Sequence, residues 1–88
     1  MKHQSQPAIL KRLKRTEGHL RAVIAMIEAQ RSCLDLAQQL HAVEKSISSA
    51  KRELVQDHME HCLGDGVTKS GKEAKNAMSE FKALAKYL

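Results

Sequence analysis

One uninterrupted stretch in the middle of the sequence constrains the fold more than any other feature. From Cys33 to Leu63 there is no glycine and no proline, and most of the residues favour a helix. Apolar residues recur along it at alternating spacings of four and three positions: Leu36, Leu40, Val43, Ile47, Ala50 and Leu54. This alternation is typical of the contact line between helices in a bundle. The stretch is therefore predicted to be one helix of ~45 Å, with Ser32 as its N-cap and Asp35 in the place of a capping-box acid.

Two shorter helices are predicted on either side of this stretch. The first runs from Pro7 to Gln30, and the third runs from Lys72 to Leu88 after a polar turn, Gly64–Gly71. Apolar side chains recur at helical spacing in both: Ile9, Leu13, Leu20, Val23, Ile24 and Ile27 in the first, and Ala74, Ala77, Met78, Phe81, Leu84 and Leu88 in the third. A long helix cannot cover its own apolar stripe, so two copies of the chain are expected to pair. The predicted fold is all-α: one domain (residues 1–88) of three helices, with an antiparallel four-helix-bundle dimer core and further assembly to a homotetramer.

The composition bears on location and on the class of partner. The chain has 88 residues, a net charge of +5 and no apolar run of the length that a membrane span requires, and its N-terminus lacks the apolar segment of a signal peptide. We therefore expect a cytoplasmic protein with no membrane partner, in which the two cysteines stay reduced and serve as ligands or reactive groups. One tyrosine, one phenylalanine and no tryptophan argue against base stacking on single strands. The positive charge favours double-stranded DNA as the partner.

Three residues form a candidate metal site. His58 and Cys62 are four positions apart, so they share one face of a helix and could chelate a soft or borderline ion such as Cu(I), Zn(II) or Ni(II). Cys33 is the obvious third ligand, but a helix of 25 positions lies between it and His58 of the same chain. That distance is ~37 Å, far beyond the reach of a shared metal ion. In an antiparallel dimer, by contrast, Cys33 of one protomer meets His58 and Cys62 of the other.

Other interpretations of these residues stay open. The cysteines could be inert core groups. Cys33 lies in the first helical turn, where the helix dipole favours a thiolate, so it could also act as a nucleophile. His61 points away from Cys62 around the helix and is expected to be solvated, whereas His3, on an N-terminal arm, is the best candidate for a fourth ligand. An enzyme is not expected, because the sequence has no phosphate-binding loop and no acid–base constellation.

Basic residues are concentrated on the first two predicted helices. The candidates for DNA contact are Lys11, Arg12, Lys14 and Arg15 on the first helix and Lys51 and Arg52 on the second. Such runs often form only a solvated face, but acidic residues are sparse in the first helix before Glu17 and the whole chain is basic. No helix-turn-helix pattern is present. The prediction is a broad electrostatic face that binds DNA and weakens with salt.

Three segments, LKRLKRTEGHLRAVIAMIE, CLDLAQQLHAVEKSISSAK and DHMEHCL, resemble the copper-sensing repressor family (CsoR/RcnR/FrmR) over nearly the whole chain. The resemblance implies a three-helix repressor that binds operator DNA in the metal-free state. Effector binding would release it and de-repress genes for efflux or resistance. The resemblance also implies that Cys33, His58 and Cys62 are Cu(I) ligands shared between subunits.

Further positions can be matched to the same family. Glu80 resembles a glutamate of the third helix that lies behind the metal ligands. Arg12 falls where the family has a DNA-contacting arginine, and Lys51 or Arg52 lie in its second basic patch. Ser32, however, occupies a position at which copper sensors often carry a tyrosine.

Other branches of the family leave the effector open. A branch that senses Ni(II) or Co(II) adds a histidine near the N-terminus, and His3 lies close to that position. A formaldehyde-sensing branch lacks the second cysteine and a persulfide-sensing branch lacks the histidine, so Cys62 and His58 argue against them in turn. A repressor that senses formaldehyde or a persulfide through Cys33 remains an alternative.

Overall fold

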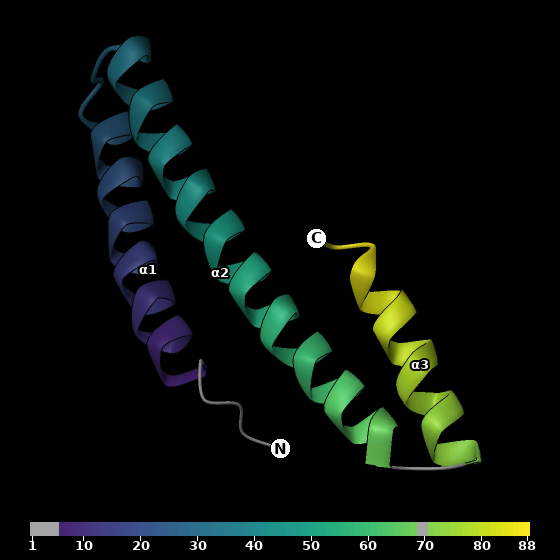
Figure 1. Cartoon of the computed structure of the whole chain (residues 1–88). Coiled ribbons are helices and arrows are strands. Elements are labelled where there is room, and N and C mark those ends of the chain that lie inside the picture. The colour runs from purple at the N-terminus through teal and green to yellow at the C-terminus, as the bar shows by residue number, and fades with distance from the viewer. Residues whose placement is uncertain (1–5, 69–70) are drawn as a thin grey trace. The chain divides into compact units, whose positions relative to one another are not determined.

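The computed structural model describes the backbone of residues 6–68 and 71–88, and the side chains of residues 6–61 and 71–88. Figure 1 shows its three helices: α1 (Gln6–Glu28), α2 (Cys33–Thr68) and α3 (Lys72–Ala85). The described residues contain no strand, so the predicted all-α class and the number of helices are confirmed. Within the described part of the chain, no helix combines the length and the apolarity needed to cross a membrane.

The middle helix is longer than predicted. Since α2 continues to Thr68, the prediction of a turn over Gly64–Gly71 is wrong for most of that range. A glycine inside a helix costs ~1 kcal/mol against alanine, which weakens the helix but does not end it when no proline follows. Gly71, with a positive φ of 63°, precedes the first residue of α3 instead. The outer helices end slightly earlier than predicted, at Glu28 and at Ala85.

Local chemistry ends α1 and starts α2. Gln30 adopts the left-handed conformation (φ 59°), its N–H donates to the carbonyl of Ile27, and the N–H of Arg31 donates to the carbonyl of Met26. This pair of bonds is a Schellman motif, which occupies carbonyls that would otherwise be left without partners at the helix end. Ser32 then caps α2, because its Oγ accepts the N–H of Asp35 at 3.1 Å. The predicted N-cap is therefore confirmed.

Close contacts divide the chain into two compact units, of which the first comprises residues 7–50. In it α1 lies antiparallel beside the first part of α2 (Figure 1). The seam between them is narrow, and its buried side chains are Ile9, Thr16, Val23, Val43 and Ala50. The α1 members recur every seventh position, as expected for two helices in lengthwise contact. The prediction that residues 1–88 form a single domain stays a prediction.

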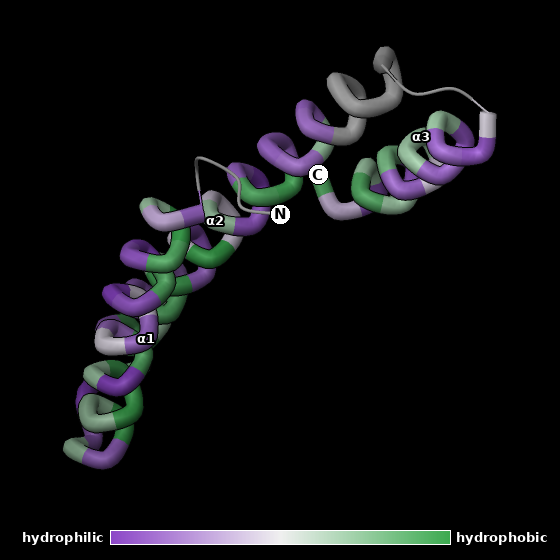
Figure 2. Tube along the Cα trace, turned by 90° about the horizontal axis from the view of Figure 1, so that it is seen from below, coloured by the Kyte–Doolittle hydropathy of each residue, from purple (hydrophilic) through white to green (hydrophobic). Residues whose placement is uncertain are grey.

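The apolar line predicted along α2 is divided between two surfaces. Val43 and Ala50 are buried in the seam, whereas Leu40 and Ile47 are nearly half exposed. Figure 2 shows apolar positions alternating with polar ones along both helices. We name six of the exposed apolar side chains of this unit, without Leu10 and Leu34, the open apolar face: Leu13, Leu20, Ile24, Ile27, Leu40 and Ile47. Two helices alone therefore leave much of their apolar surface in water.

The second unit comprises the end of α2, from Lys51, and α3. Val55 of α2 is buried, and α3 contributes a half-buried side formed by Ala74, Ala77, Phe81 and Leu84. Met78 and Leu88, predicted on the apolar side of the third helix, are about half exposed. Among its described side chains α3 has no fully buried residue, so it rests on α2 through a shallow contact.

Candidate functional site

The best-defined polar contact of the second unit joins α2 to α3. Nε2 of His58 lies 2.6 Å from Oε1 of Glu80, and the two side chains are 33% and 55% exposed. A carboxylate can only accept a hydrogen bond, so the imidazole donates its Nε2–H to Glu80. The structure thus brings together one predicted metal ligand and the glutamate that was matched to the family's third helix.

This pairing limits what His58 can do chemically. An imidazole that donates from Nε2 has Nδ1 as the nitrogen that can ligate a metal ion. Histidines that ligate metals almost always hold their second nitrogen in this way, because the bond fixes the tautomer and the ring orientation and makes the ligating nitrogen more basic. The arrangement therefore suits His58 to metal coordination through Nδ1.

His61 makes contacts within its own helix. Its Nδ1 lies 3.1 Å from the backbone carbonyl of Asp57 and 3.9 Å from that residue's Oδ1. The side chain is 36% exposed, so it is less solvated than the sequence indicates. This contact occupies Nδ1 of His61 and does not exclude ligation through Nε2, so the expectation that His61 is not a ligand stays a prediction.

The structure describes the side chain of Cys33 but not that of Cys62. Cys33 is the first residue of α2, and its thiol is free and exposed. Cys62 lies on α2 four positions after His58, but its side chain is outside the described part of the structure, as is the whole of His3. Of the described side chains, no three His, Cys, Asp or Glu residues gather closely enough within one chain to hold a metal ion. The ligand set Cys33, His58 and Cys62 therefore stays a prediction.

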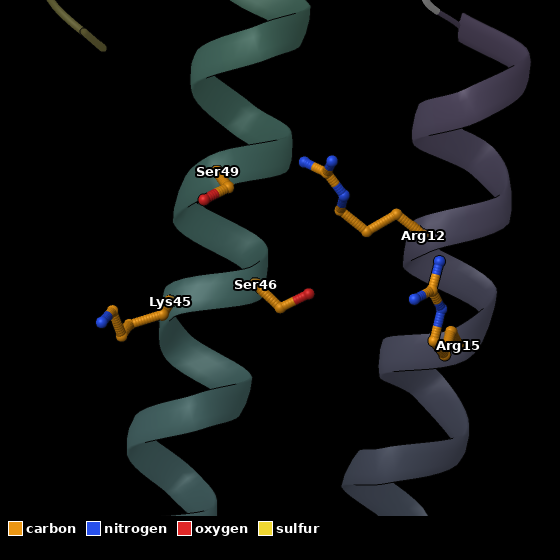
Figure 3. A pocket seen from close by; sticks show the side chains of 5 residues that line it. All are labelled: Arg12, Arg15, Lys45, Ser46 and Ser49. Carbon is orange, nitrogen blue, oxygen red and sulfur yellow. The ribbon is translucent and has the colours of Figure 1, made fainter.

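Some of the predicted DNA-contacting residues surround a hollow on the first unit. It has a volume of about 280 Å³ and is lined by Arg12 and Arg15 of α1 and by Lys45, Ser46 and Ser49 of α2 (Figure 3). Lys11 and Lys14 are exposed on the same helix as the two arginines. Lys51 and Arg52 are exposed in the second unit.

The sequence analysis did not single out the two serines of this hollow. Ser46 and Ser49 are three positions apart, so they lie on neighbouring turns of one helix face. In the sequence, the only indication of these two contact residues was their spacing directly after Lys45. This signal is weak by itself, because only the packing of α1 against α2 shows that Ser46 faces the arginines of α1.

The comparisons with known proteins agree on the type of protein. A family model described as "Metal-sensitive transcriptional repressor" matches residues 5–86. The copper-sensing transcriptional repressor CsoR of Bacillus subtilis (strain 168) is 39% identical over 73 residues, covering 83% of this chain and 70% of that protein. The copper-sensing transcriptional repressor RicR of Mycobacterium tuberculosis (strain ATCC 25618 / H37Rv) is 32% identical over 80 residues, which are 91% of this chain and 83% of its own length.

A solved structure of a transcriptional regulator has a similar fold. The nickel-responsive transcriptional regulator InrS superposes with a TM-score of 0.83 at 27% identity, over 100% of this chain and 98% of that one.

Proposed function

Because the chain belongs to the family of metal-sensitive transcriptional repressors, we propose that it binds operator DNA in the metal-free state and that Cu(I) releases it. Family membership makes it a DNA-binding regulator of transcription and not an enzyme. De-repression would then act on genes for copper efflux or resistance. The proposed location of the protein is the cytoplasm.

The choice of Cu(I) is supported by relatives and by ligand chemistry. Both curated relatives described above are named as copper sensors. Two thiolates and an imidazole form a soft ligand set, which Cu(I) prefers over harder ions. The single observation that carries the proposal is the 2.6 Å contact between His58 and Glu80, since metal-ligating histidines almost always hold one ring nitrogen in a bond of this kind. Cys33, His58 and Cys62 are the proposed ligands.

The proposed site is shared between two copies of the chain. Cys33 and His58 belong to one helix, α2, and ~37 Å of helix between them prevents both from reaching one ion. In an antiparallel dimer the start of α2 in one protomer meets the end of α2 in its partner. The open apolar face supports such a dimer, because a second copy would cover surface that α1 and α2 leave in water. We propose a four-helix dimer core, assembled further to a tetramer.

DNA binding is proposed to occur mainly through phosphates. The proposed contacts are basic residues of α1 and α2, of which Arg12 is half-buried and the others are exposed: Lys11, Lys14, Arg15, Lys51 and Arg52. Cu(I) would link the start of one α2 to the end of its partner and so alter the spacing of the basic faces on the duplex. A coupling of about 1–3 kcal/mol between the two sites, typical of allosteric proteins, is sufficient for release.

A fluorescence anisotropy titration tests the proposal. Reduced protein is titrated onto a labelled duplex from its own promoter region, under anaerobic conditions, with and without one equivalent of Cu(I) per protomer. Cu(I) should lower the affinity about tenfold or more, and a Cu(I) chelator should restore it. Cys33→Ala and His58→Ala should bind the duplex but ignore Cu(I). His41→Ala, which alters an exposed histidine of the same helix, is the matched control and should respond like the wild type. A wild-type affinity that Cu(I) leaves unchanged contradicts the proposal.

A nickel sensor is the second candidate, because the structural neighbour described above is nickel-responsive. Ni(II) or Co(II) would need harder ligands beside the thiolates, and His3 is the proposed addition. The same titration with Ni(II) separates the two functions. Release by Ni(II) that His3→Ala abolishes, together with no effect of Cu(I), would replace the copper assignment. Zn(II) is included as a further divalent comparison.

A sensor that reacts through a thiol can be distinguished from a metal sensor by the mass of the protein. The exposed thiol of Cys33 could react with formaldehyde or a persulfide instead of binding a metal. Intact-mass spectrometry after exposure to either reagent shows an adduct in that case. The metal sensor is favoured if Cu(I) binds stoichiometrically and changes the DNA affinity, and if neither reagent leaves an adduct.

A further inference from the structure

The hollow between α1 and α2 combines charge with neutral hydrogen-bond donors. In Figure 3 the side chain of Arg12 extends from α1 toward α2, and the hydroxyl of Ser46 points back toward α1. Lys45 extends away from α1 in the same view, and the hydroxyl of Ser49 also points away from α1, so Ser49 would donate into the hollow from another side-chain rotamer. Guanidinium and hydroxyl groups gathered around one open space favour a bound anion over a cation or an apolar group.

The two serines add directional hydrogen-bond donors, which a face made of charged side chains alone lacks. Ser46 is half-buried and Ser49 is exposed, and both side chains line the hollow. A hydroxyl donates one hydrogen bond in a defined direction, whereas a lysine or arginine at a surface attracts any anion nearby. Donors of this kind fix the position of a phosphate group, and serine is a common phosphate contact in protein–DNA complexes.

Ser46 has a second role in the seam. Its Oγ lies 2.7 Å from Oγ1 of Thr16, and Thr16 donates its only hydroxyl proton to the backbone carbonyl of Arg12 at 3.0 Å. In that arrangement Ser46 donates to Thr16. If the Thr16 hydroxyl rotates toward Ser46, the proton of Ser46 becomes available to an anion in the hollow. One hydroxyl can therefore serve both the seam and the hollow.

We propose that this hollow holds one phosphate of the DNA backbone, with Ser46 and Ser49 donating hydrogen bonds and Arg12 and Arg15 supplying the charge. The inference rests on the proposed function and makes it more specific, because it assigns the phosphate contact to Arg12 and Arg15 among the basic residues of α1. Lys14 points about 100° away from Arg15 around the helix, whereas Lys11, four positions before Arg15, shares its face; neither lysine lines the hollow. They add attraction over a distance without contacting this phosphate.

The test compares affinity and salt dependence on a short labelled duplex of random sequence, with metal-free, reduced, full-length protein. Ser46→Ala/Ser49→Ala should lower the affinity about tenfold or more, because hydrogen bonds to a charged group are lost. Its slope of log affinity against log salt should match the wild type, since no charge is removed. Arg15→Gln should lower the affinity and also reduce the slope by ~0.9 for each contacting subunit.

Two controls separate phosphate binding from folding. Thr16→Val removes the same Thr16–Ser46 hydrogen bond but keeps both serine hydroxyls, so it should bind the duplex within about threefold of the wild type. Ser49→Thr keeps the hydroxyl and should also retain binding. Circular dichroism verifies that each variant is helical.

Several outcomes would overturn the inference. One is a double serine variant that binds as the wild type does, and another is a Thr16→Val variant that loses as much affinity as the double serine variant. A third is inorganic phosphate that blocks the duplex beyond the effect of chloride at equal ionic strength, because the hollow would then be a site for free phosphate. A wild type that binds the duplex but ignores every metal contradicts the proposed function and leaves this site standing.

Discussion

His58 on α2 and Glu80 on α3 are joined by a 2.6 Å contact between Nε2 and Oε1. The contact links a candidate metal ligand to a helix that has no fully buried residue among its described side chains. A helix held by so shallow an apolar contact depends more on such a bond than a deeply packed helix does. Changes at His58 are therefore expected to reach α3 directly.

Glu80→Gln should weaken Cu(I) binding about 10- to 100-fold, because a neutral amide holds the imidazole less firmly and makes Nδ1 less basic. Competition with a chromophoric Cu(I) chelator measures the affinity. Glu73→Gln, which changes another exposed carboxylate of α3, is the matched control and should bind as the wild type does. Equal Cu(I) affinities for both variants would contradict the proposed role of Glu80.

Thr16→Val should destabilise the fold by about 1 kcal/mol, because Ser46 loses its partner in a seam where Thr16 is only 7% exposed. Urea unfolding at fixed protomer concentration provides the free energy. The double variant Thr16→Val/Ser46→Ala completes a mutant cycle, in which the pair should show a coupling of about 0.5–1.5 kcal/mol. Strict additivity would mean that this hydrogen bond adds no stability.

Ile47→Glu should break the proposed oligomer, because it places a charge on the open apolar face. Sedimentation velocity should show a smaller species, and circular dichroism should show a fall in helicity. Leu34→Glu is the control, since Leu34 is even more exposed and lies on another side of α2 by helix geometry. If both variants sediment like the wild type, the open apolar face is not where two copies meet.

Ser32→Ala should lower the stability by about 1 kcal/mol, because the N–H of Asp35 loses the Oγ that accepts it at the start of α2. Thermal and urea unfolding report the change. Ser32→Asp, which can also cap a helix, should keep most of the stability. A loss as large with aspartate as with alanine would show that the serine acts in some other way.

Much of the local structure was predictable from local chemistry. The three helices, the Ser32 cap and the candidate ligands on α2 follow from helix propensity, apolar spacing and side-chain type, which act within a few residues of the chain. The end of α2 was not predictable in the same way. Glycine lowers helix stability by an amount that neighbouring contacts can outweigh, and α2 continues past Gly64 to Thr68.

The sequence by itself determined that this chain is helical, basic and equipped with a soft set of candidate metal ligands, because these properties depend on residue type and spacing. Only the tertiary structure decided which groups meet. It divided one apolar line of α2 between the buried Val43 and Ala50 and the open Leu40 and Ile47, and it joined His58 to Glu80. It also placed Ser46 opposite the arginines of α1. Such pairings depend on the rotation and register of one helix against another, which the packing of side chains fixes and which the spacing along a single helix leaves undetermined.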